Sequence, residues 1–174
     1  MYEDNRVIIV PSTAHDIFEL KDNLRQEDIA ECAACGHTPK QALIEGYTWS
    51  ECYSAKVKGK TEAMFGVSSY NQPKGYGVIW YLGSNESFRH PIALVKGGRE
   101  YVDKWLEKYN ILHNVVDIRN TRHIAWLKHI GFIFTDTVMI NGYVFLKFYK
   151  CKRAEGENVS DTRLTPNKQE ERSK

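Results

Sequence analysis

The chain has 174 residues, of which 42% are hydrophobic and 12% are aromatic, and its net charge is +2 at pH 7. These values are typical of one globular domain with a real core and exclude a disordered chain. Acidic and basic residues are mixed throughout, so the charge gives no support for nucleic-acid binding. No apolar run approaches the roughly 20 residues of a membrane helix. The acidic start is unlike a signal peptide, so the four cysteines indicate synthesis in a reducing, intracellular compartment.

The first fifty residues predict one strand and two helices. Residues 7–10 are a compact apolar run that ends before a proline. From 15 to 35 the apolar residues recur at helical spacing, with a break near Asn23. Thr38 and Pro39 then begin the second helix, because proline is favoured at the first helical position.

Three strands are predicted next. Residues 52–57 and 63–67 lie on either side of a tight turn at 58–60, which is the pattern of an antiparallel hairpin. Residues 77–83 are nearly all apolar. Such a run predicts a central strand that is covered on both faces of the sheet.

A long amphipathic helix is predicted between residues 88 and 109, where apolar residues again recur at helical spacing. Gly97 and Gly98 lie inside this pattern. A glycine costs about 1 kcal/mol of helix stability relative to alanine. We therefore expect these two glycines to let the helix approach the sheet closely.

Residues 114–132 carry the clearest signal of the fold. Residues 115–118 predict a buried strand, and Asn120 leads directly into a short helix. The apolar face of this helix consists of Ile124, Leu127 and Ile130. Gly131 ends the helix, where a residue that tolerates positive φ is preferred, and Phe132 opens the next strand.

The last two strands are predicted at residues 132–135 and 143–149, joined by a turn at 141–142. Beyond these strands the sequence consists mostly of charged and small polar residues. We therefore expect one domain over residues 1–151 and a flexible charged tail over residues 152–174.

The predicted order is β-α-α-β-β-β-α-β-α-β-β. Three consecutive hairpin strands precede one βαβ crossover, which predicts an α/β fold with a mixed central β-sheet flanked by helices. This order, together with V-x-x-x-N before a helix that ends in Gly-Phe, resembles the GNAT (Gcn5-related) N-acetyltransferase family. The resemblance covers about residues 6–149 and implies a GNAT-like fold that binds acetyl-CoA or CoA.

In that family, main-chain groups beside a splayed strand pair hold the pantetheine of acetyl-CoA, and an asparagine orders the cofactor arm. By resemblance, Leu82, Gly83 and Ser84 would form the cofactor edge, and Asn120 would order the arm. The full set of expected cofactor-binding residues is Leu82, Gly83, Ser84, Arg89, His90, Asn120 and Trp126.

Two features depart from the family pattern. The family's phosphate loop is rich in glycine, so that backbone N–H groups reach the pyrophosphate at a helix N-terminus. Here residues 84–91 contain no glycine and include Glu86 and Pro91, so that only side chains such as Arg89 and His90 could meet a phosphate. The family's general acid is a tyrosine four residues before Gly-Phe, and that position is Leu127, which cannot donate a proton. The sequence therefore singles out no catalytic residue.

A narrower resemblance is to small internal virion or core proteins of short-tailed bacteriophages, which have a GNAT-like acyltransferase domain. The segments that carry it are Leu24-Arg25, Asp28, Glu31-Cys32, 63–67, 79–83 and 114–132. It implies a role in virion assembly. The expected partners are phage structural proteins or a host protein, and the expected location is the host cytoplasm or the virion.

Cys32, Cys35 and His37 suggest a zinc or redox site, with Cys52 as a further ligand. A single C-x-x-C is a weak signal, because structural zinc sites usually pair two such motifs. We favour cysteines buried as small apolar residues. No metal site is predicted.

Three other polar residues could serve either a functional site or the structure alone. His90 stands beside the expected cofactor loop and is a candidate base or phosphate contact, whereas His123 is expected near the surface of its helix. Asp117 lies in an apolar strand, where an unpaired carboxylate is costly. We expect it to pair with Arg119 or Arg122 rather than to serve a site.

Two functions of different class follow from the sequence. The first is a phage protein in which an acyltransferase scaffold serves virion assembly or internal core structure. The second is an active acetyl-CoA-dependent N-acetyltransferase that modifies an amine of a host or phage protein. The absent glycines and Leu127 favour the first.

Overall fold

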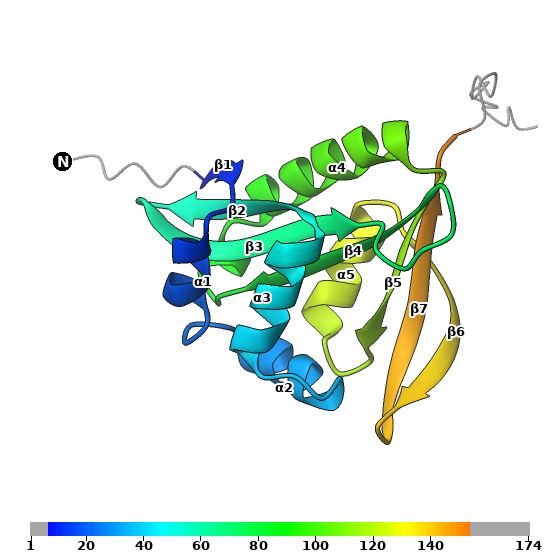
Figure 1. Ribbon diagram of the computed structural model, residues 1–174, viewed down its shortest axis with the longest axis horizontal. Coiled ribbons are helices and arrows are strands. Elements are labelled where there is room, and N and C mark those ends of the chain that lie inside the picture. The colour runs from blue at the N-terminus through cyan, green and yellow to red at the C-terminus, as the bar shows by residue number, and fades with distance from the viewer. Residues whose placement is uncertain (1–6, 154–174) are drawn as a thin grey trace, which may run out of the picture.

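The computed structural model describes residues 7–153, and its framework is a seven-stranded sheet (Figure 1). The strands are β1 (Val7–Pro11), β2 (Glu51–Val57), β3 (Lys60–Ser68), β4 (Tyr76–Gly83), β5 (Ile111–Asp117), β6 (Ile133–Ile140) and β7 (Tyr143–Cys151). The helices are α1 (Ala14–Leu20), α2 (Gln26–Ala34), α3 (Pro39–Trp49), the 3-10 turn η1 (Ser87–Arg89), α4 (Pro91–Lys108) and α5 (Thr121–His129). The strand order is β1-β2-β3-β4-β5-β7-β6, with β4 and β5 parallel and all other pairs antiparallel. The predicted mixed α/β fold is confirmed.

The predicted order of elements differs from the structure between β1 and β2, where three helices replace two. The helix predicted over residues 15–35 is divided into α1 and α2, because the chain turns at residues 21–25. The N–H of Asn23 donates to the carbonyl oxygen of Leu20 at 2.8 Å in this turn. The turn carries Arg25 into the interior, where it is fully buried. The predicted tail lies outside the described residues, apart from residues 152 and 153.

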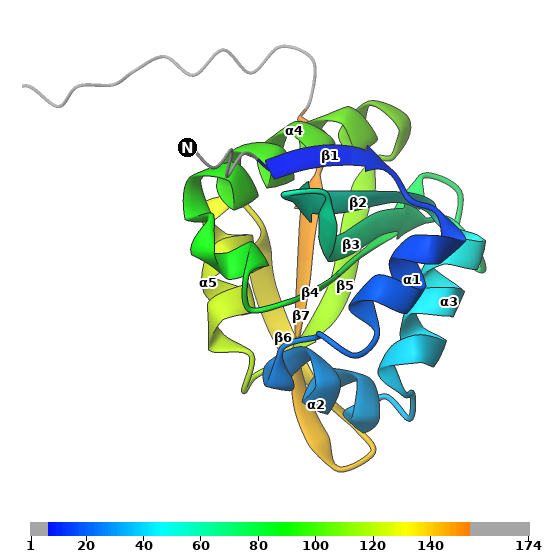
Figure 2. The same cartoon turned by 90° about the vertical axis from the view of Figure 1, so that its left-hand side faces the viewer.

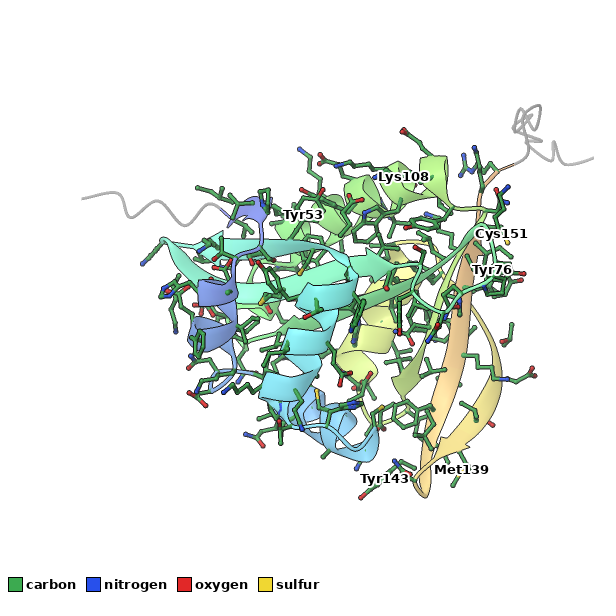
Figure 3. The ribbon with its side chains drawn as sticks, viewed as in Figure 1. Tyr53, Tyr76, Lys108, Met139, Tyr143 and Cys151 are labelled. Carbon is green, nitrogen blue, oxygen red and sulfur yellow. The ribbon has the colours of Figure 1, made fainter. Side chains whose placement is uncertain are left out.

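Turn residues stand where the sequence predicted them. Asn141 and Gly142 have φ of 48° and 84°, and they join β6 to β7 as a two-residue hairpin turn. Gly131, with φ of 94°, follows α5. Tyr143 lies at the end of the β6–β7 hairpin (Figure 3), which is fixed to α2 because Asn141 Nδ2 donates to the carbonyl oxygen of Ala34 at 2.9 Å.

The sheet separates two apolar cores, one under α4 and α5 and the other under α1, α2 and α3 (Figure 2). The α4/α5 core consists of Val67, Ile79, Val102, Trp105, Leu106, Leu112, Val116, Leu127, Ile130, Phe132 and Phe148. The α1–α3 core consists of Ile17, Leu20, Leu24, Leu43 and Met64. β4 lies between the cores and has no exposed residue, which confirms the predicted central strand. Among the described residues, no helix is both long and apolar enough to cross a membrane.

The two glycines of α4 allow different neighbouring elements to approach this helix closely. A Cβ on Gly97 would lie 3.1 Å from Cδ1 of Ile9, in the edge strand β1. A Cβ on Gly98 would lie 2.8 Å from the indole of Trp126, in α5. The prediction that both glycines serve contact with the sheet is therefore right for Gly97 and wrong for Gly98, which serves contact between two helices.

Candidate functional site

The candidate site lies where β4 and β5 part. The two strands pair only through residues 76–78 and 111–113 and then diverge towards their carboxyl ends (Figure 1). Asn114 spans the start of the gap, because its Nδ2 donates to the carbonyl oxygen of Ile79 at 2.6 Å. Backbone groups that lose their sheet partner need another one. The diverging edge of β4 is therefore a place where a ligand could bond to the main chain.

The expected cofactor edge, from Leu82 to Ser84, is occupied by the chain itself. The N–H of Gly83 donates to Asp28 Oδ2 at 2.9 Å, and the carbonyl oxygen of Gly83 accepts from the N–H of Arg25 at 3.0 Å. Leu82 and Ser84 face β3 instead, since main-chain groups alternate in direction along a strand. The start of α2 thus takes the place beside β4 that a ligand would need.

A buried polar cluster of Arg25, Asp28, Glu31 and Asn120 connects α2 to the end of β5. Asn120 Nδ2 donates to Asp28 Oδ1 at 3.1 Å and to Glu31 Oε2 at 3.0 Å. Its Oδ1 accepts from Arg25 Nη2 at 3.4 Å. Arg25 and Asp28 form an ion pair in which both side chains are almost completely buried. The amide of Asn120, expected to order a cofactor arm, is engaged with α2.

Both carboxyl groups of this cluster have raised pKa values. Burial raises the pKa of Asp28, and the Arg25 charge and the Gly83 N–H oppose that rise. Burial also raises the pKa of Glu31 to about 7, against the hydrogen bond from Asn120 and with help from the negative charge of Asp28. Shifted carboxyl groups are found at functional sites and in structural networks alike. The role of Asp28 and Glu31 therefore follows from the groups that they contact, and these belong to α2, β4 and Asn120.

Asp117 belongs to a separate ion pair at the end of β5. Arg119 Nε donates to Asp117 Oδ1 at 2.9 Å, and the hydrogen bonds from Arg119 lower the pKa of that carboxyl. The predicted pairing of Asp117 with Arg119 is confirmed.

The loop before α4 holds the two side chains that were expected to meet a phosphate. Arg89 Nη1 lies 3.1 Å from Glu86 Oε2, and His90 Nε2 lies 3.3 Å from Glu86 Oε1. Pro91 is the first residue of α4 and lacks the N–H that a phosphate could accept from. A carboxylate at this position repels a phosphate, and it already contacts both Arg89 and His90.

Neither of two neighbouring residues on α5 can act as the general acid. Leu127 is buried in the α4/α5 core. Trp126 packs against Gly98, and its Nε1 donates to the carbonyl oxygen of Leu94 at 3.1 Å. Trp126 therefore helps to fix α5 against α4 and offers no proton for catalysis.

Tyr81 and His123 are buried polar residues of the site that the sequence did not single out. Each is 7% exposed, and their ring centroids are 5.7 Å apart. Burial, and to a smaller extent the charge of Arg25, lower the pKa of His123 to about 3. The prediction that His123 lies near the surface is wrong. The signal was present, since His123 is spaced four and seven residues from Leu127 and Ile130 and so shares their buried face.

A cavity of about 420 Å³ crosses the gap between the strands. On the α2 side its lining includes Glu31, Cys35 and His37; on the α4 side it includes Leu94, Trp126 and His123. Most of the lining is apolar, with Tyr81, Ser87 and His90 near the start of α4. A concave, largely apolar site with a few polar groups is typical of small-molecule binding.

Cys32, the cysteine of α2, is unsuited to redox chemistry. Burial raises the pKa of Cys32 to about 12, which leaves its thiol protonated and unreactive. In the part of the chain that the structure describes, all four cysteines are free, and no cluster of three His, Cys, Asp or Glu side chains could hold a metal ion.

These contacts do not fit acetyl-CoA. Pantetheine would need the backbone groups of Gly83 that Arg25 and Asp28 already use. The pyrophosphate would meet Glu86 and a helix that begins with proline. The occupied backbone groups of Gly83 and the Glu86 carboxylate in the loop before α4 are independent features, and both oppose cofactor binding.

Comparison with known proteins gives a sequence family and a fold. Residues 69–138 match the family described as bacteriophage T7 probable scaffold protein Gp13. The probable scaffold protein gp13 of Escherichia phage T7 is 49% identical over 119 residues, which are 66% of this chain and 78% of that protein.

The solved structures that resemble this chain include GNAT acetyltransferases. The aminoglycoside acetyltransferase AAC(6')-Ib, in complex with ribostamycin and coenzyme A, matches with a TM-score of 0.66 over 89% of this chain and 98% of its own, at 15% identity. The ribosomal-protein-S18-alanine N-acetyltransferase from Escherichia coli matches with a TM-score of 0.62 over 88% and 99%, at 11% identity. These likenesses show that the chain has the GNAT fold.

Proposed function

Because this chain belongs to the family of the bacteriophage T7 probable scaffold protein gp13, we propose that it is a structural protein of virion assembly, built on a GNAT fold. The observation that carries this proposal is the closed edge of β4, where Arg25 and Asp28 hold both backbone groups of Gly83. Glu86 in the phosphate loop and Leu127 at the acid position support it. Its partners are phage structural proteins, in the host cytoplasm and in the particle.

The second candidate is an acetyl-CoA-dependent N-acetyltransferase that modifies an amine of a host or phage protein. Two observations favour it: the fold neighbour that holds coenzyme A, and the cavity that crosses the sheet. Enzymes can accelerate such transfers mainly by positioning an amine against a thioester. For this chain, however, α2 would have to release Gly83 before a cofactor could bind.

Calorimetric titration of the full-length protein with acetyl-CoA and with CoA separates the two candidates. We expect no heat of binding up to millimolar cofactor, because the edge of β4 is occupied. The informative variant is Arg89→Ala, which removes an exposed cation from the phosphate loop. Arg99→Ala, an exposed position of α4, is its matched control. Micromolar binding that Arg89→Ala abolishes and Arg99→Ala retains would overturn the structural proposal.

The assembly role has its own test. Mass spectrometry of purified phage particles and of isolated assembly intermediates should detect this protein in at least one of the two. If it is missing from both, the assembly role is wrong, whatever the titration shows.

A further inference from the structure

The cavity is lined mostly by apolar side chains, with polar ones at several places, among them Glu31, Glu62, Tyr81 and His123; the region beside Tyr81 and His123 is called its polar end. Its apolar part runs beneath α4, past Leu94, Gly98 and Trp126. At its polar end Tyr81 and His123 both line the cavity. Apolar cavities of this size accept small apolar molecules more readily than water, whereas buried polar groups require partners. The two ends together indicate an amphipathic occupant.

Two polar atoms at this end are buried without a hydrogen bond among the described residues: the hydroxyl oxygen of Tyr81 and Nδ1 of His123. Ser87 lies beside Tyr81 and affects the pKa of its hydroxyl, but no hydrogen bond of normal geometry joins the two side chains, and the Ser87 hydroxyl donates to the carbonyl oxygen of Ser84 at 2.6 Å. Leaving such atoms unpaired is unfavourable, and native proteins rarely do so. Since both side chains are more than nine-tenths buried and line one cavity, they point to a ligand in it.

A third unpaired atom, Nη1 of Arg25, lies close behind this end of the cavity. The guanidinium stacks on Phe88 with Cζ 3.8 Å from the ring centroid, and Phe88 contacts Tyr81 with ring centroids 6.0 Å apart. The charge of Arg25 is balanced by Asp28. His123 stays neutral at physiological pH because burial lowers its pKa to about 3. A charged ligand group would therefore find no uncompensated opposite charge, whereas an uncharged one would find hydrogen-bond partners.

We propose that this cavity binds a small uncharged amphipathic molecule: an aliphatic chain beneath α4 and a primary amide between Tyr81 and His123. A primary amide both accepts and donates, so it can accept from the Tyr81 hydroxyl and donate to Nδ1 of His123. Such a ligand needs neither the backbone of Gly83 nor the phosphate loop. The proposal therefore requires neither the assembly role nor acetyl-CoA binding to be correct.

Titration of the full-length protein with octanamide, followed by tryptophan fluorescence, tests the proposal, because Trp80 and Trp126 line the cavity. We expect saturable binding that weakens about three- to tenfold in Tyr81→Phe, the loss typical of one hydrogen bond. Octanoate, which has the same chain but a charged head, should bind at least tenfold more weakly.

Tyr81→Phe should keep its melting temperature, since the hydroxyl that it removes makes no hydrogen bond with residues 7–153. The matched control is Tyr101→Phe, the same change in the apolar part of the cavity, which should bind octanamide like the unchanged protein. Absence of saturable binding at millimolar octanamide would overturn the proposal. Equal affinity of the Tyr81→Phe variant, or equal binding of octanoate, would overturn the assignment of the polar end.

Discussion

At the scale of single residues, Arg25 is the largest side chain that the described residues bury completely. Its partner Asp28 is buried with it and also accepts the N–H of Gly83. Removing one member of a buried ion pair leaves the other charge uncompensated, which typically costs about 3–5 kcal/mol. We therefore expect Arg25→Met to lower the free energy of unfolding in urea by about 3 kcal/mol or more.

The control for this prediction is the double variant Arg25→Met with Asp28→Asn. Asparagine carries no charge, and its one oxygen still accepts from either Gly83 or Asn120, so part of the lost stability should return. A single variant within about 0.5 kcal/mol of the unchanged protein would mean that the pair is not structural.

Glu31 and His123 predict opposite effects of pH. Burial raises the pKa of Glu31 from its ordinary 4.5 to about 7, so ionisation favours the unfolded state and stability falls as pH rises from 4.5 to 7. Burial lowers the pKa of His123 from 6.5 to about 3, so protonation favours the unfolded state and stability falls as pH falls from 6.5 to 3. Between pH 4.5 and 6.5 the two effects offset one another.

Glu31→Gln removes only the first effect. Its stability should therefore rise with pH between 4.5 and 6.5 by about 1–2 kcal/mol more than that of the unchanged protein. Urea denaturation at the two pH values measures the difference. Parallel pH profiles of variant and unchanged protein would show that Glu31 titrates at its ordinary pKa.

At the scale of elements, Gly97 and Gly98 of α4 are two adjacent sites at which substitution by alanine can be compared. Alanine at either position gains up to about 1 kcal/mol of helix propensity. At Gly98 the new Cβ would meet the indole of Trp126 at 2.8 Å, and that ring is fixed by its bond to Leu94. At Gly97 it would meet only the movable end of Ile9 at 3.1 Å. We expect the free energy of unfolding of Gly98→Ala to be about 1–3 kcal/mol lower than that of Gly97→Ala. Gly98→Ala should therefore also melt at the lower temperature. Equal melting temperatures would show that α4 and α5 can move apart freely.

Most elements of this fold could be predicted because their signals are local. The turn at Asn141 and Gly142, the stop at Gly131 and the apolar run of β4 each depend on a few neighbouring residues. The boundary between α1 and α2 was predicted only as a break near Asn23. The burial of Arg25 there depends on partners far along the chain, which no local pattern reveals.

The candidate site was less predictable than the fold for the same reason. The sequence predicted Gly83 as part of a cofactor edge, but it could not show that Asp28, 55 residues earlier, accepts the N–H of Gly83. It identified Asn120 but not the direction of its amide, which bonds across 92 residues to Asp28. His123 was misplaced, although its helical spacing from Leu127 held the information.

At the scale of the whole molecule, the sheet has one weak joint. β4 and β5 share only the pairing of residues 76–78 with 111–113, whereas every other neighbouring pair of strands is joined along at least five residue pairs. The polar cluster of Arg25, Asp28, Glu31 and Asn120 reinforces this joint, because it links α2 and the end of β4 to the end of β5. The same contacts that occupy the backbone groups of Gly83 thus hold the two halves of the sheet together.

This arrangement predicts that the two cores unfold together. Leu43→Ala creates a cavity in the α1–α3 core, which typically costs about 2–5 kcal/mol. β3 supplies Met64 to that core and Val67 to the α4/α5 core. The loss of stability should therefore affect both faces of the sheet. Hydrogen exchange in low urea, read by mass spectrometry, should show the same loss of stability in peptides from α3 and from β7. Faster exchange confined to α1–α3 would mean that the joint between β4 and β5 lets the halves unfold separately.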